Sequence, residues 1–84
     1  MTGVLFTSKS LTYAQRMVRT LLFAGISAKV VRPDIALMGR SCAYGVNISA
    51  SFLPEAVEVL RNNRLYPVRV LVSDDGKEFR EIRI

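Results

Sequence analysis

In the first third of the chain, a short continuous run of hydrophobic residues is followed by hydrophobic residues at helical spacing. Gly3 to Ser8 is an apolar and β-branched run bounded by polar residues, which is typical of an interior strand. After it, apolar side chains recur every three or four positions, which predicts a helix with one apolar face. That face is formed by Leu11, Ala14, Met17, Val18, Leu21 and Leu22. Ser10 or Thr12 would cap the start of this helix and Gly25 its end.

Two further strands are predicted on either side of a loop. Ile26 to Arg32 follows the helix as a strand, and Pro33 with Asp34 ends it because proline cannot donate a hydrogen bond to a sheet. Residues 34 to 43 are then expected to form a loop. Beyond it, apolar residues alternate with small or polar ones from Tyr44 to Ser49, the pattern of a strand with one buried face.

The last third of the chain predicts a second helix and a terminal hairpin. From about Phe52 to Arg64, acidic residues precede basic ones and Pro54 lies in the first turn, which suits the helix dipole. A fourth strand follows Pro67, and its alternating apolar residues are Val68, Val70 and Val72. Asp75-Gly76 is a strong hairpin signal. The residues beyond it predict a short edge strand that folds back on the fourth, with apolar positions at Phe79, Ile82 and Ile84.

The predicted element order is βαββαβ with a terminal β extension. Two right-handed β-α-β crossovers in that order place both helices on one face of a mainly antiparallel sheet. We therefore expect residues 1–84 to form a single domain of the α+β class. The expected architecture is a ferredoxin-like βαββαβ two-layer sandwich with a short C-terminal β extension. Folds of this kind carry many functions, so function has to be inferred from individual sites.

Composition indicates a small globular protein of the cytoplasm. The 84 residues are 50% hydrophobic, which suffices for one modest core. No apolar stretch reaches the roughly 18 residues of a membrane span, so no membrane partner is expected. The first residues carry no charged leader, so a signal peptide is not expected either. The single cysteine excludes an intramolecular disulfide, and a free thiol is typical of a reducing compartment.

Positive charge is concentrated in the first half of the chain. Residues 1 to 50 hold six basic side chains and one acidic one, whereas basic and acidic side chains cancel in residues 51 to 84. The net charge of +5 therefore belongs to the half that contains the cysteine. Such a field would attract an anionic ligand, an acidic partner or nucleic acid, or it would simply keep the protein soluble.

Several kinds of chemistry are excluded because the residues they need are absent. Without histidine and with one cysteine, neither a zinc site within one chain nor a cysteine-histidine nucleophile is expected. The chain has no glycine-rich phosphate loop or dinucleotide motif, so no cofactor is expected. The acidic residues near the predicted turn are interpreted as solvated charge. The protein is therefore not expected to be a self-sufficient catalyst.

Cys42 is the leading candidate for side-chain chemistry. It stands in Arg40-Ser41-Cys42-Ala43, just before the third predicted strand. The Arg40 guanidinium, the Ser41 hydroxyl and loop amides could stabilise a thiolate and so lower the pKa of the thiol. A buried cysteine that acts as a small hydrophobe at the start of a strand is the alternative.

The chain resembles the selenium/sulfur carrier-like family over approximately Gly3 to Leu65. The resemblance lies in the opening strand that ends in Phe6-Thr7-Ser8, the helix before Gly25-Ile26, Pro33 after the second strand, and Ser41-Cys42-Ala43-Tyr44-Gly45-Val46. The family motif is a cysteine preceded by a polar residue and followed by glycine and a strand. This chain has Ala43 at the glycine position.

The resemblance implies that Cys42 carries sulfur or selenium as a persulfide or selenosulfide. A sulfur donor such as a cysteine desulfurase would load the thiol, and an acceptor enzyme would unload it. Arg40 would then stabilise the terminal anion and Gly45 would permit close backbone approach. A lip for partner docking would be formed by Ile35, Leu37 and Met38, which could equally cover a small core.

Two other functions stay open from the sequence. RNA-recognition domains share the βαββαβ order and present aromatic residues on their first and third strands, which Phe6 and Tyr44 imitate. Ser49, however, stands where another stacking aromatic residue is expected, so nucleic acid is the less favoured partner. The third hypothesis is a ligand-sensing or oligomeric assembly module, in which exposed sheet surface and the terminal edge strand pair between the subunits of a homodimer.

Overall fold

The computed structural model of the chain describes residues 3–32, 44–74 and 78–82. Its first strand and helix coincide closely with the predicted ones. Strand β1 (Gly3–Ser8) leads into helix α1 (Leu11–Phe23), which ends before Gly25. Ser10 is the residue that caps α1, because its side-chain oxygen accepts a hydrogen bond from the Tyr13 amide.

The remaining elements follow in the predicted order. They are strand β2 (Lys29–Val31), strand β3 (Tyr44–Ser49), the 3-10 helix η1 (Ala50–Phe52), helix α3 (Leu53–Asn62), and strands β4 (Val70–Ser73) and β5 (Arg80–Ile82). The predicted loop at 34–43 and the predicted turn at Asp75-Gly76 lie outside the described residues. The fold is thus a mixed α+β fold, in which a 3-10 turn precedes the second helix.

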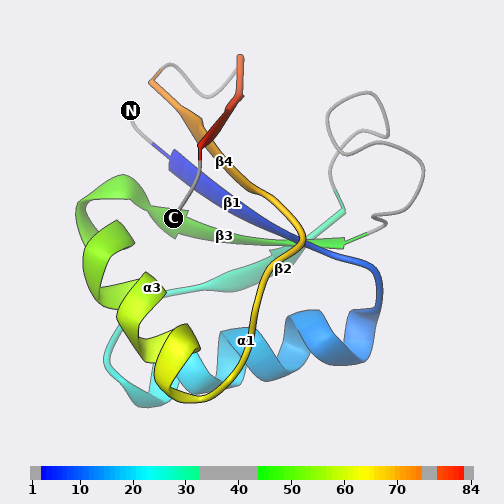
Figure 1. Cartoon of the computed structure of the whole chain (residues 1–84), viewed down its shortest axis with the longest axis vertical. Helices are drawn as coiled ribbons and strands as arrows, with labels where there is room; N and C mark the ends of the chain where they lie inside the picture. The colour runs from blue at the N-terminus through cyan, green and yellow to red at the C-terminus, as the bar shows by residue number, and fades with distance from the viewer. Residues whose placement is uncertain (1–2, 33–43, 75–77, 83–84) are drawn as a thin grey trace.

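The five strands of the described residues belong to one sheet of order β2-β3-β1-β4-β5, and every neighbouring pair is antiparallel. Strand β1 lies in the middle, and Figure 1 shows it between β3 and β4. Its register places Val4 opposite Ile48 on one side and opposite Val72 on the other. The first strand of the chain is therefore held by two partners that come much later in the sequence.

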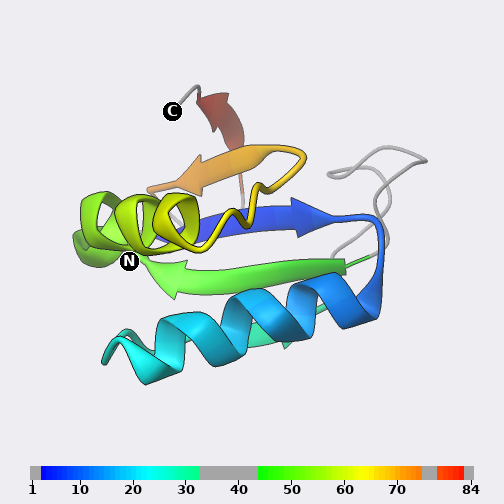
Figure 2. The same cartoon turned by 60° about the horizontal axis from the view of Figure 1, so that its bottom comes forward.

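Both helices pack on the same face of the sheet, as Figure 2 shows. Strand residues that point toward the helices alternate with residues that point away, so Val4 and Phe6 join the helix-side core while Leu5 does not. Five buried side chains extend from the helices into this core: Ala14, Met17, Leu21, Ala56 and Leu60. The arrangement is compatible with a two-layer sandwich whose core lies between helices and sheet.

The opposite face of the sheet carries a smaller apolar cluster. Leu5 and Leu71 are buried there, with Val31 and Phe79 packed against them. The main core and this cluster use alternate residues of the same strands.

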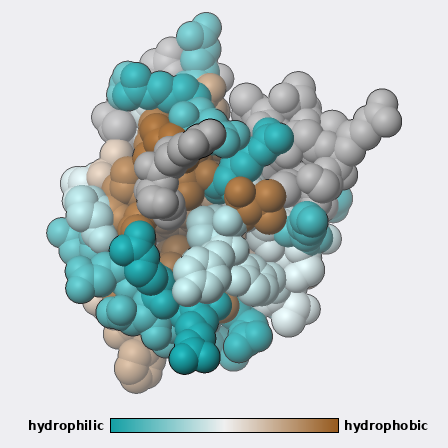
Figure 3. Space-filling view, viewed as in Figure 1, coloured by the Kyte–Doolittle hydropathy of each residue, from teal (hydrophilic) through white to brown (hydrophobic). Residues whose placement is uncertain are grey.

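On the surface drawn in Figure 3, apolar side chains gather beside the β4–β5 part of the sheet, above α3, and polar ones cover most of the rest.

Candidate functional site

The end of the sheet where β1 stops and β3 begins is the part of the described fold nearest in sequence to the predicted site. Ser8 pairs with Tyr44, and Thr7 pairs with Gly45. Strand β2 ends at the same place, because Val31 also pairs with Gly45. Figure 1 shows the end of β1 and the start of β3 and of α1 together on the right-hand side. We call this region the β3-entry end of the sheet.

Three serine hydrogen bonds set the start of α1 at this end. The Ser8 hydroxyl donates to the carbonyl oxygen of Ser10 at 2.9 Å, and the Ser10 amide donates to the Ser8 hydroxyl at 3.3 Å. The Ser10 hydroxyl in turn accepts from the Tyr13 amide at 3.0 Å. Ser8 is itself buried, so the turn is anchored in the core. The positive end of the α1 dipole is thereby fixed beside the ends of β1 and β3.

Thr7 ties the same end of the sheet to the segment before β4. Its Oγ1 accepts a hydrogen bond from the Arg69 amide at 2.8 Å and lies 3.4 Å from the Arg69 carbonyl oxygen. The Thr7 backbone bonds to both Arg69 and Val68, so pairing extends beyond the first residue of β4. Thr7 is fully buried. This satisfied polar side chain makes the β3-entry end a fixed rather than a frayed end of the sheet.

The electrostatic character of this end is positive. Lys9 and Arg32 are exposed there, and the Arg32 guanidinium carbon lies 5.5 Å from the centre of the Tyr44 ring, within cation–π range. No acidic residue occurs anywhere in residues 1 to 33. Arg69 differs, because its Nε lies 3.5 Å from Glu81 Oε1 in an exposed ion pair that contributes little stability. The described groups at this end therefore favour an anion.

Most of the predicted site residues lie outside the described residues. This holds for Cys42 and its neighbours Arg40, Ser41 and Ala43, and also for the predicted docking lip of Ile35, Leu37 and Met38. Gly45 is described. It is buried in β3, between Thr7 of β1 and Val31 of β2, so its backbone is approached closely by two other strands.

The two aromatic residues behind the RNA hypothesis both lie on the helix side of the sheet. Phe6 is completely buried in the main core, and Tyr44 is half-buried against the same core. The positions on the other face of β1 and β3 are held by Leu5, Thr7 and Asn47 instead. A base therefore cannot stack on Phe6, and β1 offers no aromatic platform on the sheet face that the helices leave uncovered.

The described residues also limit two other kinds of site. In residues 3–32, 44–74 and 78–82, no group of three or more metal-ligating side chains is placed to hold a metal ion. Within the same ranges, neither helix has the length and apolar character needed to cross a bilayer.

Sequence reasoning missed two contacts at the β3-entry end. The Arg32–Tyr44 contact joins the ends of two strands on either side of the predicted loop, and the Thr7–Arg69 hydrogen bonds join residues 62 positions apart. A basic residue at the end of one strand and a tyrosine at the start of the next was a usable signal for the first contact. No local pattern marks the second, because Thr7 reads as an ordinary strand residue.

Comparison of the chain with protein-family models, curated proteins and solved structures gave no match.

Proposed function

We propose that the protein is a carrier that holds sulfur or selenium on Cys42 as a persulfide or selenosulfide. One observation supports this more than any other: β3 begins at Tyr44, opposite Ser8 and beside the start of α1. Cys42 precedes Tyr44 by two residues, and two Cα–Cα steps span at most about 7.6 Å. Along the chain, Cys42 is therefore only two residues from the positively charged β3-entry end.

The charges at that end suit a thiolate and a persulfide, both of which are anions. The helix dipole of α1, Lys9 and Arg32 contribute positive potential from described residues. Arg40 would add a cation from the Cys42 segment itself. We accordingly expect the pKa of the Cys42 thiol to lie below that of an unperturbed cysteine, because nearby positive charge stabilises the ionised form.

The proposed transfer balances without an external oxidant or reductant. The Cys42 thiolate attacks the terminal sulfur of a donor persulfide, a new S–S bond forms, the donor's S–S bond breaks, and the donor leaves as a thiolate. The acceptor then attacks the terminal sulfur on Cys42, which leaves as a thiolate in its turn. A cysteine desulfurase would be a suitable donor. With no second cysteine in the chain, the acceptor has to be another molecule, and we propose that it is an acceptor enzyme.

Loading by a cysteine desulfurase and free cysteine tests the proposal. Intact-mass spectrometry should detect the addition of one sulfur atom to the protein, and a reductant should remove it. Cys42→Ser should stay unmodified under the same conditions. An unmodified wild-type protein, in a reaction that loads a known carrier, would contradict the carrier function.

A matched pair of arginine variants tests whether positive charge at the β3-entry end makes the Cys42 thiol more reactive. Arg32→Gln should slow alkylation of the thiol by iodoacetamide near neutral pH, because it removes a cation from the β3-entry end. Arg61→Gln serves as the control, since it removes an exposed arginine near the end of α3. Equal rates in both variants would show that Arg32 does not act on the thiol.

We also propose the finer description of the fold as ferredoxin-like. The order β2-β3-β1-β4 supports it, with one helix after β1 and another after β3. Location in the cytoplasm is part of the same proposal, because a carrier thiol has to stay reduced between transfers.

A further inference from the structure

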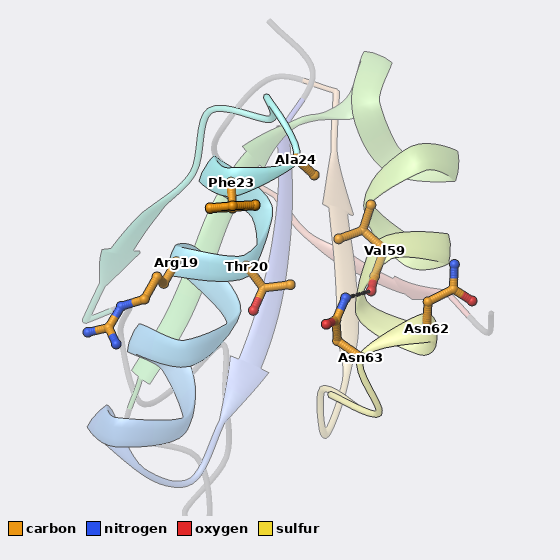
Figure 4. Close-up of a pocket in the computed structure, with 7 residues that line it drawn as sticks. All are labelled: Arg19, Thr20, Phe23, Ala24, Val59, Asn62 and Asn63. Carbon is orange, nitrogen blue, oxygen red and sulfur yellow. Dashed lines mark hydrogen bonds between the residues drawn. The ribbon is translucent and has the colours of Figure 1, made fainter.

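A groove runs between the two helices, on the side of the molecule that faces away from the sheet. It encloses about 390 Å³, and Figure 4 shows its two walls. Six of its lining residues carry the argument below: Arg19, Thr20 and Phe23 from α1, and Val59, Asn62 and Asn63 from the end of α3. The groove lies near the C-terminal end of α1, whereas the β3-entry end lies at its N-terminus.

Phe23 is the most unusual residue of the groove, because this aromatic residue is 95% exposed. It is the last residue of α1, and Leu22 before it is also exposed. Figure 4 shows the Phe23 ring standing out from the helix above Arg19. A fully exposed aromatic side chain beside a groove offers a large apolar contact area that the folded chain does not use.

The opposite wall, formed by the end of α3, has an apolar side chain in the middle and a side-chain hydrogen bond at its end. Val59 contributes an aliphatic side chain that is only partly buried. The Asn63 side-chain amide donates to the Val59 carbonyl oxygen at 2.8 Å, a bond drawn as a dashed line in Figure 4. Thr20 points from α1 toward this wall. The groove is therefore a formed feature with an apolar centre and a polar rim.

On the α1 side of the groove, all charged side chains are positive. This helix contains Arg16 and Arg19 and no acidic residue. Arg16, Arg19 and Phe23 follow one another at three- and four-residue intervals, so they share one stripe of the helix. Both arginines are exposed, and neither is ion-paired with another residue in the described part of the chain. None of the residues that line the groove is acidic, and the exposed Glu55 and Glu58 of α3 lie earlier in that helix than the lining residues Val59, Asn62 and Asn63.

We propose that this groove binds an acidic amphipathic helix of a partner protein. A large apolar side chain of that helix would pack between Phe23 and Val59, and its carboxylates would lie along Arg16 and Arg19. Aromatic and arginine side chains around an apolar centre are the composition that protein interfaces favour. A nucleic-acid strand is the competing anionic ligand, since bases can stack on Phe23 and Arg19, but it would leave the aliphatic Val59 of the opposite wall without an apolar partner. The proposal does not depend on the sulfur-carrier function.

Titration of the ¹⁵N-labelled protein with a model peptide tests this. The probe is a four-turn helix rich in glutamate, with leucines on one face. Amide signals of the last turns of α1 and α3 should shift, and affinity should fall as salt is added. Phe23→Ser should weaken binding by about tenfold or more, because it removes the apolar anchor. Tyr66→Ser is the matched control, since Tyr66 is an exposed aromatic residue outside the groove and its loss should leave affinity unchanged.

Charge reversal provides the second arm of the experiment. Arg19→Glu should weaken binding and reduce its salt dependence, whereas Arg80→Glu on β5 should do neither. A peptide with lysine in place of glutamate should not bind. The proposal is overturned if the acidic peptide does not bind, if the shifted signals lie elsewhere, if the lysine peptide binds as well, or if a single-stranded oligonucleotide binds the same residues more tightly. All these variants change exposed residues, and the spread of amide signals verifies that each is folded.

Discussion

Thr7 shows how one buried polar residue can join distant parts of this chain. Its side chain is fully buried, yet its hydroxyl oxygen accepts a hydrogen bond from the Arg69 amide, 62 residues later. A buried polar group is tolerated when such a partner is present. Loss of the hydroxyl would leave the Arg69 amide without its acceptor, at the point where the chain enters β4.

Thr7→Val is therefore expected to lower the free energy of unfolding by about 1–3 kcal/mol, because valine has a similar shape but no acceptor. Thr12→Val at an exposed position of α1 is the control and should change it by less than about 0.5 kcal/mol. Urea denaturation of the three proteins measures both values. Equal stability of the two variants would mean that the Thr7 hydrogen bond contributes nothing.

For single residues, the sequence shows which residue types are suitable for a function but not which neighbours surround them in the fold. Phe6 and Tyr44 have the identity and spacing of stacking residues, but the direction of their side chains depends on which face of the sheet the helices cover. Arg32 and Tyr44 meet only because β2 and β3 are neighbours. Whether Cys42 is a carrier thiol remains a prediction from the sequence.

The two helices end in the same way with different residues. In α1, the Gly25 amide bonds to the Leu22 carbonyl and the Ile26 amide to the Leu21 carbonyl. In α3, Arg64 and Leu65 make the corresponding bonds to Arg61 and Leu60. This Schellman geometry needs a left-handed residue, and φ is 86° at Gly25 and 56° at Arg64. Glycine adopts that conformation freely, whereas arginine does so at a cost.

A pair of opposite substitutions tests this difference. Gly25→Ala should destabilise the protein by about 1 kcal/mol, because alanine is strained at a positive φ. Arg64→Gly should stabilise it by about 0.5–1 kcal/mol, since relief of strain exceeds the added freedom of the unfolded chain. Thermal unfolding of both variants shows whether each substitution raises or lowers the stability. A stabilising Gly25→Ala or a destabilising Arg64→Gly would contradict the assignment.

The bounds of the strands show where local sequence patterns are enough to predict an element. Gly3–Ser8 and Tyr44–Ser49 were predicted to the residue, because polar residues bound the first strand and apolar residues alternate with small or polar ones throughout the second. The second strand was predicted from Ile26 but begins at Lys29, since the Ile26 amide still bonds to the end of α1. The predicted fourth strand included Val68. The strand begins at Val70, although the Val68 amide pairs with Thr7.

For the whole molecule, the position of β1 organises the sheet. It has a partner on each side, whereas β2 and β5 form the two edges and have three residues each. The exposed Arg80 and Glu81 of β5 are the kind of side chain that discourages pairing of an edge with another chain. The homodimer considered from the sequence would use this edge together with exposed sheet surface.

Amide hydrogen exchange should therefore be slowest in β1 and fastest in β2 and β5, because a central strand opens only when both neighbours separate. Exchange followed by NMR at several times resolves the order. Protection in β5 equal to that in β1 would contradict this hierarchy and would indicate that β5 is covered in solution, as in a strand-paired dimer.

The central position of β1 also has a consequence during synthesis on the ribosome. β1 leaves the ribosome before the other strands of the sheet. Its partners on either side, β3 and β4, are made roughly 40 and 67 residues later, starting at Tyr44 and Val70. Until then the nascent chain presents Val4, Leu5 and Phe6 with no strand to pair with. We expect the emerging segment to be a target for chaperones that hold apolar extended chains, and the sheet to close only after β4 has been made.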